Sequence, residues 1–97
     1  MGSRHDEVAK GIAAKVGGDY NRGKGVDIVT TKVAIEVETE TTIPDAKVQL
    51  QGHRKPSYIA VTTKRAVEKA VEATRGTAIG VIDPQGKVVK RSTRRRR

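Results

Sequence analysis

Apolar residues recur at helical spacing at the start of the chain. Val8, Ile12 and Val16 are four residues apart, and Ala9 and Ala13 widen this apolar stripe. This pattern predicts an amphipathic helix over residues 4–16, which Gly17 ends.

Further along the chain, the pattern of side chains has a period of two residues, which is typical of a β-strand. Apolar and polar residues alternate over 33–39, and a second β-type run covers 26–30. We expect these two runs to form an antiparallel hairpin with a two-residue turn at 31–32. The register that places Ile28 opposite Ile35 sorts both strands into one apolar and one acidic face.

The second half of the chain alternates helix and strand signals. We expect a helix over 44–53, a strand over 57–62, a helix over 64–75, a strand over 77–82, a turn over 83–86 and a short edge strand over 87–90. Helices between successive strands make those strands parallel neighbours. The predicted fold class is α/β, a mixed central β-sheet flanked by helices, in the order α-β-β-α-β-α-β-β.

Composition narrows the architecture further. The 97 residues suffice for one domain, which we place at 1–90, followed by a basic disordered tail at 91–97. With two tyrosines as the sole aromatic residues, the core must be built from Val, Ile, Ala and Leu50. The absence of cysteine excludes disulfides and thiolate zinc sites. We see no signal peptide or membrane span and expect a cytoplasmic protein.

The charge balance points to a polyanionic partner. The formal net charge is +9 and the isoelectric point about 10.3. Five positive charges, Arg91 and Arg94 to Arg97, lie in the predicted tail. The other candidate contacts to nucleic acid are Arg22 and Lys24 in a glycine-rich loop, Gln49 on the second helix, and Arg54 and Lys55 after that helix.

The acidic face of the hairpin is the candidate for chemistry. Asp27 stands directly opposite Glu36, and Glu38 shares their face. Three close carboxylates repel one another, and a hard cation such as Mg²⁺ or Mn²⁺, helped by a backbone carbonyl such as that of Val37, relieves the repulsion. The alternative is a solvated acidic face neutralised by Lys24, Lys32 or Lys47. Spacing alone leaves both readings open.

A short motif adds to this pattern. Gly25-Val26-Asp27 followed by Ile35-Glu36-Val37-Glu38 resembles the PD-(D/E)xK nuclease pattern, with small archaeal Holliday-junction resolvases as the most similar members. The resemblance implies a restriction-endonuclease-like fold, a homodimer, and Asp27 and Glu36 as metal ligands. It further implies a supporting metal ligand from the first helix, for which Glu7 is the candidate.

The chain departs from the motif at one position. The motif lysine falls on Glu38, which then acts as a metal ligand or a water-orienting base, or marks an inactive domain. Lys47 on the second helix is the candidate for a migrated lysine that stabilises charge. Gln49 and Gln51 on the same helix resemble the glutamine that some branches of the family use near the site.

The resulting hypothesis is a Mg²⁺- or Mn²⁺-dependent endonuclease that hydrolyses DNA phosphodiester bonds, with four-way junctions as a candidate substrate. A catalytically inactive DNA-binding module of the same fold and a small structural RNA-binding protein are the alternatives. His5 and His53 have no partner at metal-ligand spacing and are predicted to be surface residues.

Overall fold

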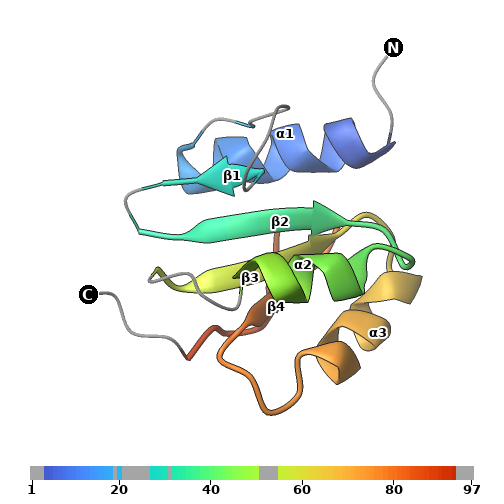
Figure 1. Ribbon diagram of the computed structural model, residues 1–97. Coiled ribbons are helices and arrows are strands. Elements are labelled where there is room, and N and C mark those ends of the chain that lie inside the picture. The colour runs from blue at the N-terminus through green and yellow to red at the C-terminus, as the bar shows by residue number, and fades with distance from the viewer. Residues whose placement is uncertain (1–3, 19, 21–26, 31, 51–54, 94–97) are drawn as a thin grey trace.

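The computed structural model describes residues 4–18, 20, 27–30, 32–50 and 55–93, and shows a five-stranded sheet flanked by helices (Figure 1). The elements follow the predicted order α-β-β-α-β-α-β-β. The helices are α1 (Arg4–Val16), α2 (Ile43–Leu50) and α3 (Arg65–Ala73). The strands are β1 (Ile28–Val29), β2 (Ala34–Glu38), β3 (Ser57–Val61), β4 (Gly80–Ile82) and β5 (Val88–Lys90). The coarse α/β prediction is therefore confirmed.

The strands lie in the sheet in the order β1-β2-β3-β4-β5. The three central strands are parallel, and the two outer strands are antiparallel to their neighbours. The hairpin register is as predicted, with Ile28 opposite Ile35 and the Thr30 N–H donating to the Val33 carbonyl over 2.9 Å. Tyr20 forms an isolated antiparallel bridge with Ile28 on the outer side of β1.

Helices cover both faces of the sheet, and two aliphatic clusters form the core. On one face, Val8 and Ile12 of α1 pack with Ile28, Ile35 and Val37. On the other face, α2 and α3 pack against β2, β3 and β4, chiefly through alanine, valine, isoleucine and Leu50. The core composition expected from the sequence is confirmed, since the buried hydrophobic side chains among the described residues are all Ala, Val, Ile or Leu.

Several boundaries differ from the prediction. The second helix begins at Ile43, one residue early, and residues 51–53 of its predicted span lie outside the described residues. The strand predicted from Thr77 begins at Gly80. Thr77 instead donates both its N–H and its hydroxyl to the Thr74 carbonyl, at 3.0 and 2.7 Å, and so continues the turn that ends α3.

The packed domain extends beyond the predicted boundary at residue 90. The Ser92 hydroxyl and the Thr93 N–H both donate to the Ala78 carbonyl, over 2.7 and 3.0 Å. The first residues assigned to the tail therefore belong to the body, because they satisfy backbone groups beside β4. Residues 94–97 lie outside the described part. Among the described residues, no helix combines the length and apolarity needed to span a bilayer.

Candidate metal centre

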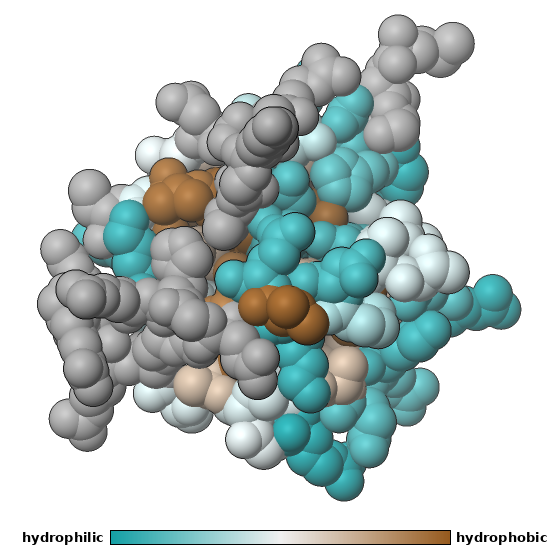
Figure 2. All heavy atoms as spheres, in the orientation of Figure 1, coloured by the Kyte–Doolittle hydropathy of each residue, from teal (hydrophilic) through white to brown (hydrophobic). Residues whose placement is uncertain are grey.

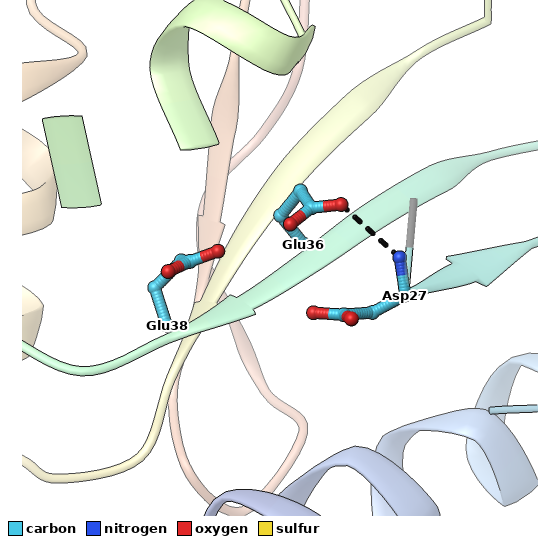
Figure 3. Close-up of side chains that lie close together, drawn as sticks. All are labelled: Asp27, Glu36 and Glu38. Carbon is cyan, nitrogen blue, oxygen red and sulfur yellow. Dashed lines mark hydrogen bonds between the residues drawn. The ribbon is translucent and has the colours of Figure 1, made fainter. Parts of the chain in front are cut away.

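The hairpin brings three carboxylates together at one place. One carboxylate oxygen each from Asp27, Glu36 and Glu38 lies within 4.8 Å of the other two. Glu36 and Glu38 project from the same side of β2, and Asp27, just before β1, extends its carboxylate toward them (Figure 3). The grouping expected from the register is therefore present in the folded chain.

The acidic face is buried, which corrects the alternative of a solvated face. Glu36 is 4 % exposed and Glu38 9 % exposed, and Asp27 has intermediate exposure. The reason is tertiary, since α2 packs on this face of β2. Within the described part of the chain, no lysine or arginine forms an ion pair with any of the three. Of the lysines expected to neutralise a solvated face, Lys32 and Lys47 therefore form no ion pair with the cluster, and Lys24 lies outside the described residues.

Backbone hydrogen bonds fix two of the carboxylates in a reciprocal arrangement. The Asp27 N–H donates to Glu36 Oε1 over 3.1 Å (Figure 3). The Val37 N–H donates to Asp27 Oδ2 over 2.8 Å. Each carboxylate is held by an N–H of the opposite strand, so the regular ladder of β1 gives way to side-chain contacts at Asp27.

His5, predicted to be a surface residue, is part of the site. Its Nε2 bonds the Val37 carbonyl oxygen over 2.6 Å and lies 3.8 Å from Asp27 Oδ2. A carbonyl oxygen only accepts, so Nε2 carries a hydrogen. The sequence held a signal for this position: His5 is three and seven residues before Val8 and Ile12, on the apolar stripe that faces the sheet.

A polar network behind the imidazole holds its other nitrogen. The Tyr20 hydroxyl donates to Asp6 Oδ1 over 2.9 Å and is 3.1 Å from His5 Nδ1. The two rings lie with their centroids 5.9 Å apart. The Tyr20 hydroxyl thus helps to orient the imidazole, as residues behind a metal or catalytic histidine commonly do.

Crowding of the three acids changes their titration. Burial, the neighbouring Asp27 charge and a hydrogen bond with Glu38 raise the pKa of Glu36 to about 8. Near neutral pH the metal-free Glu36 carboxyl is therefore largely protonated. Because the shared hydrogen bond stabilises its protonated form, Glu36 is the donor and Glu38 the acceptor.

The other two acids shift in the same direction for a similar reason. Burial raises the pKa of Asp27, while the Val37 N–H and the nearby His5 oppose the rise. Burial also raises the pKa of Glu38, against hydrogen bonds from Thr42 and Glu36. A cluster in which all three acids resist ionisation is costly to keep charged without a compensating cation.

The donor set and spacing fit a hard divalent cation. Two oxygens on opposite sides of one Mg²⁺ lie about 4.2 Å apart, twice its usual bond length of roughly 2.1 Å. The observed 4.8 Å limit is within a small side-chain adjustment of that value. The Val37 carbonyl expected as a further ligand already accepts the His5 hydrogen bond, so a cation there shares it or displaces the imidazole.

The remaining predicted residues occupy different places. Glu7 is exposed on α1, outside the group of three carboxylates. Lys47 is half-buried on α2 and Gln49 is exposed on the same helix. Lys55 donates from Nζ to the Thr30 carbonyl over 2.8 Å. This contact lies near the amino-terminal end of β2, and Glu38 is at the other end of that strand. Arg22, Lys24, Gln51, His53 and Arg54 lie outside the described residues.

Comparison of the chain with protein-family models, with curated proteins and with solved structures gives no match. The functional conclusion therefore depends on the site itself and on the motif resemblance.

Proposed function

We propose that this protein is a Mg²⁺- or Mn²⁺-dependent endonuclease that hydrolyses phosphodiester bonds of DNA. The observation that carries the proposal is the buried cluster of Asp27, Glu36 and Glu38, whose oxygens lie within 4.8 Å in a chain of net charge +9. Grouping three acids with no lysine or arginine ion pair among the described residues costs stability, and a bound cation is the simplest compensation.

The motif and the architecture support the nuclease class. Asp27 and Glu36 occupy the two acid positions of the PD-(D/E)xK pattern, and a mixed sheet flanked by helices is compatible with the restriction-endonuclease-like fold that we propose. Among the described residues on the face of the molecule that carries α2, most are hydrophilic, and the hydrophobic ones form small separate groups (Figure 2). Such a surface suits a charged partner better than a large apolar one.

Each residue then has a definite task. Asp27, Glu36 and Glu38 would hold the cation, which supplies Lewis-acid stabilisation of the phosphate and a more acidic water. His5 positions the segment between Glu36 and Glu38 by its bond to Val37. Glu38, which accepts from Glu36 and Thr42, is the candidate to orient the attacking water. Lys47 on α2 is the candidate to stabilise developing charge.

A non-catalytic DNA-binding module is the second candidate. It is favoured by Glu38 at the lysine position of the motif and by the lack of a lysine ion pair to the cluster within the described residues. On this alternative the cation serves stability and the fold serves recognition. It predicts binding to branched DNA with no cleavage in any divalent metal.

Cleavage assays separate the two candidates. Labelled four-way-junction, duplex and single-stranded DNA are incubated with Mg²⁺ or Mn²⁺ and wild-type protein, Asp27→Asn or the control Glu68→Gln, which changes an exposed acid on α3. We expect cleavage by wild type and the control and none by Asp27→Asn. Equal cleavage by Asp27→Asn would contradict the assignment of this cluster as the metal centre of a nuclease. Light scattering on the same samples tests the homodimer that the resemblance implies.

A further inference from the structure

A pocket lies beside the candidate metal centre, at the carboxyl ends of two parallel strands. It has a volume of about 330 Å³ and is lined by Arg4, Thr39, Glu40, Thr41, Thr62 and Thr63. Thr39 and Thr62 directly follow β2 and β3. The carboxyl ends of parallel strands are the usual place for ligands in open α/β sheets, so this position favours a ligand site.

Thr62 is the feature that points to a ligand site. It is only 3 % exposed, and its hydroxyl has no hydrogen-bond partner anywhere in the described part of the chain. The alternation along β3 puts its side chain on the same face as Ala60, which is the face covered by α1. A buried hydroxyl without a partner costs free energy, and a polar ligand in this pocket would remove that cost.

Arg4 gives the pocket a positive donor. Its Nε donates to the Thr62 carbonyl over 3.0 Å, which anchors the guanidinium beside the unpartnered hydroxyl. The side chain is exposed, and it forms no ion pair with a described carboxylate. The remaining guanidinium N–H groups form a planar fork of the kind that matches phosphate oxygens.

Two helix N-termini add to the same electrostatic preference. Both α2 and α3 begin at this edge, two residues after Thr41 and Thr63 of the pocket. The partial positive charge of a helix start favours an anion. The Thr63 hydroxyl accepts the Ala66 N–H over 3.2 Å, so its own hydrogen is free to point at a ligand. Glu40 opposes an anion, but it lies 3.8 Å from Arg65 Nε, which offsets its charge.

We propose that this pocket holds a phosphate group of the nucleic-acid backbone, bound by Arg4 and by the hydroxyls of Thr62 and Thr63. The pocket adjoins the metal centre, because the Thr62 N–H donates to the Glu38 carbonyl over 3.1 Å. It would therefore hold the substrate by a phosphate near the bond that is cut. The choice of nucleic acid as the source of the phosphate rests on the proposed nuclease function; the anion site itself does not.

Titration of the isotope-labelled full chain with inorganic phosphate, in EDTA at constant ionic strength, tests the anion site. We expect saturable amide shifts at Thr39, Thr62 and Thr63, with affinity lowered roughly tenfold or more in Thr62→Val and in Arg4→Gln. Arg75→Gln, which removes an exposed arginine just beyond the far end of α3, is the matched control and should bind as wild type does. Shifts that do not saturate, or an equal loss in the control, would overturn the site.

The stability of Thr62→Val separates a ligand role from a structural one. Valine is nearly isosteric with threonine, and removing an unsatisfied hydroxyl leaves the melting temperature unchanged or raises it. Weaker phosphate binding in a protein at least as stable as wild type supports the proposal. Unchanged binding in that protein contradicts it.

Measurements of DNA binding distinguish a nucleic-acid phosphate from free phosphate as the ligand of the pocket. For junction and duplex DNA without cleavage, Arg4→Gln should weaken binding and reduce the slope of log affinity against log salt by about one. Loss of phosphate binding with an unchanged DNA slope would contradict the backbone assignment. In Asp27→Asn we expect phosphate binding to persist while cleavage is lost. If the wild-type protein binds phosphate saturably and through Thr62 but never cleaves DNA, the proposed nuclease function is wrong and the anion site is still supported.

Discussion

His5 donates a hydrogen bond from Nε2 to the carbonyl oxygen of Val37 over 2.6 Å, joining the first turn of α1 to β2 between Glu36 and Glu38. The strand segment that carries two of the three acids is thus held from the other side of the sheet. The spacing of the candidate metal ligands therefore depends on α1 as well as on the hairpin that contains them.

Replacing His5 should loosen this attachment. In His5→Ala the buried Val37 carbonyl loses a partner, which we expect to cost about 1–3 kcal/mol in the free energy of unfolding and to weaken Mn²⁺ binding. Chemical denaturation and calorimetric titration measure the two effects. His5→Gln, which keeps an N–H donor, should recover part of both. If His5→Ala behaves like Gln49→Ala, a change at an exposed position on α2, the positioning role is wrong.

The stability of the metal-free protein should fall as the pH rises from about 4.5 to about 8. The pKa of Glu36 is raised from 4.5 to about 8, so over this window the folded chain keeps a proton that the unfolded chain has released. Each unit of such a shift is worth about 1.4 kcal/mol, and the loss should be at least that large. Melting curves in EDTA at several pH values measure it.

Glu36→Gln is the control for that titration. The amide cannot ionise, so its melting temperature should depend less on pH and exceed that of the metal-free wild type at pH 8. The raised pKa values of Asp27 and Glu38 act with the same sign and should leave a smaller slope. A wild-type curve as flat as that of Glu36→Gln would contradict the burial account of this cluster.

Divalent cations should stabilise the wild-type protein. At a concentration 100 times the dissociation constant, a cation bound to the folded state alone adds about 2.7 kcal/mol, roughly a 10–20 °C rise in melting temperature for a domain of this size. Asp27→Asn should lose most of that rise, and Glu68→Gln should keep it. Equal stabilisation of all three proteins would show that the cation binds elsewhere.

Cation binding should release a proton near neutral pH. The Glu36 carboxyl is largely protonated in the metal-free state and must ionise to act as a ligand. Titration calorimetry in buffers of different ionisation enthalpy counts the protons released. Binding with no proton release at pH 7, or affinity that falls as the pH rises, would show that Glu36 is not a ligand.

A pair of glycine substitutions tests the packing between β4 and the end of the chain. A Cβ at Gly80 would lie 2.5 Å from the Lys90 carbonyl oxygen, 2.5 Å from Tyr58 Cε2 and 2.6 Å from the Ser92 N, so Gly80→Ala should cost about 1–3 kcal/mol. Gly11→Ala meets no atom within 4 Å and should add up to about 1 kcal/mol of stability through helix propensity. Thermal unfolding compares them, and equal melting temperatures would contradict the close approach.

Much of the local structure followed from patterns in the chain. The helical spacing of Val8 and Ile12 predicted α1 with its observed bounds, and the alternation around Ile35 predicted the register of the hairpin. The register in turn grouped Asp27 with Glu36, because a strand turns successive side chains to opposite faces. Strand β4 was predicted to begin too early, because Thr77 donates a hydrogen bond to the Thr74 carbonyl and so belongs to the turn after α3. Residue type does not reveal such a turn contact.

What the sequence by itself determined is which side chains share a strand face or a helix stripe, since those periods of two and 3.6 residues are properties of the backbone. The tertiary structure alone decided what covers each face. Packing of α2 converted an acidic face that could have been solvated into a buried cluster with raised pKa values. The docking of α1 brought His5 to Val37 and left Glu7, two residues further and about 200° around the helix, exposed. Such contacts depend on where whole elements pack, which no local period encodes.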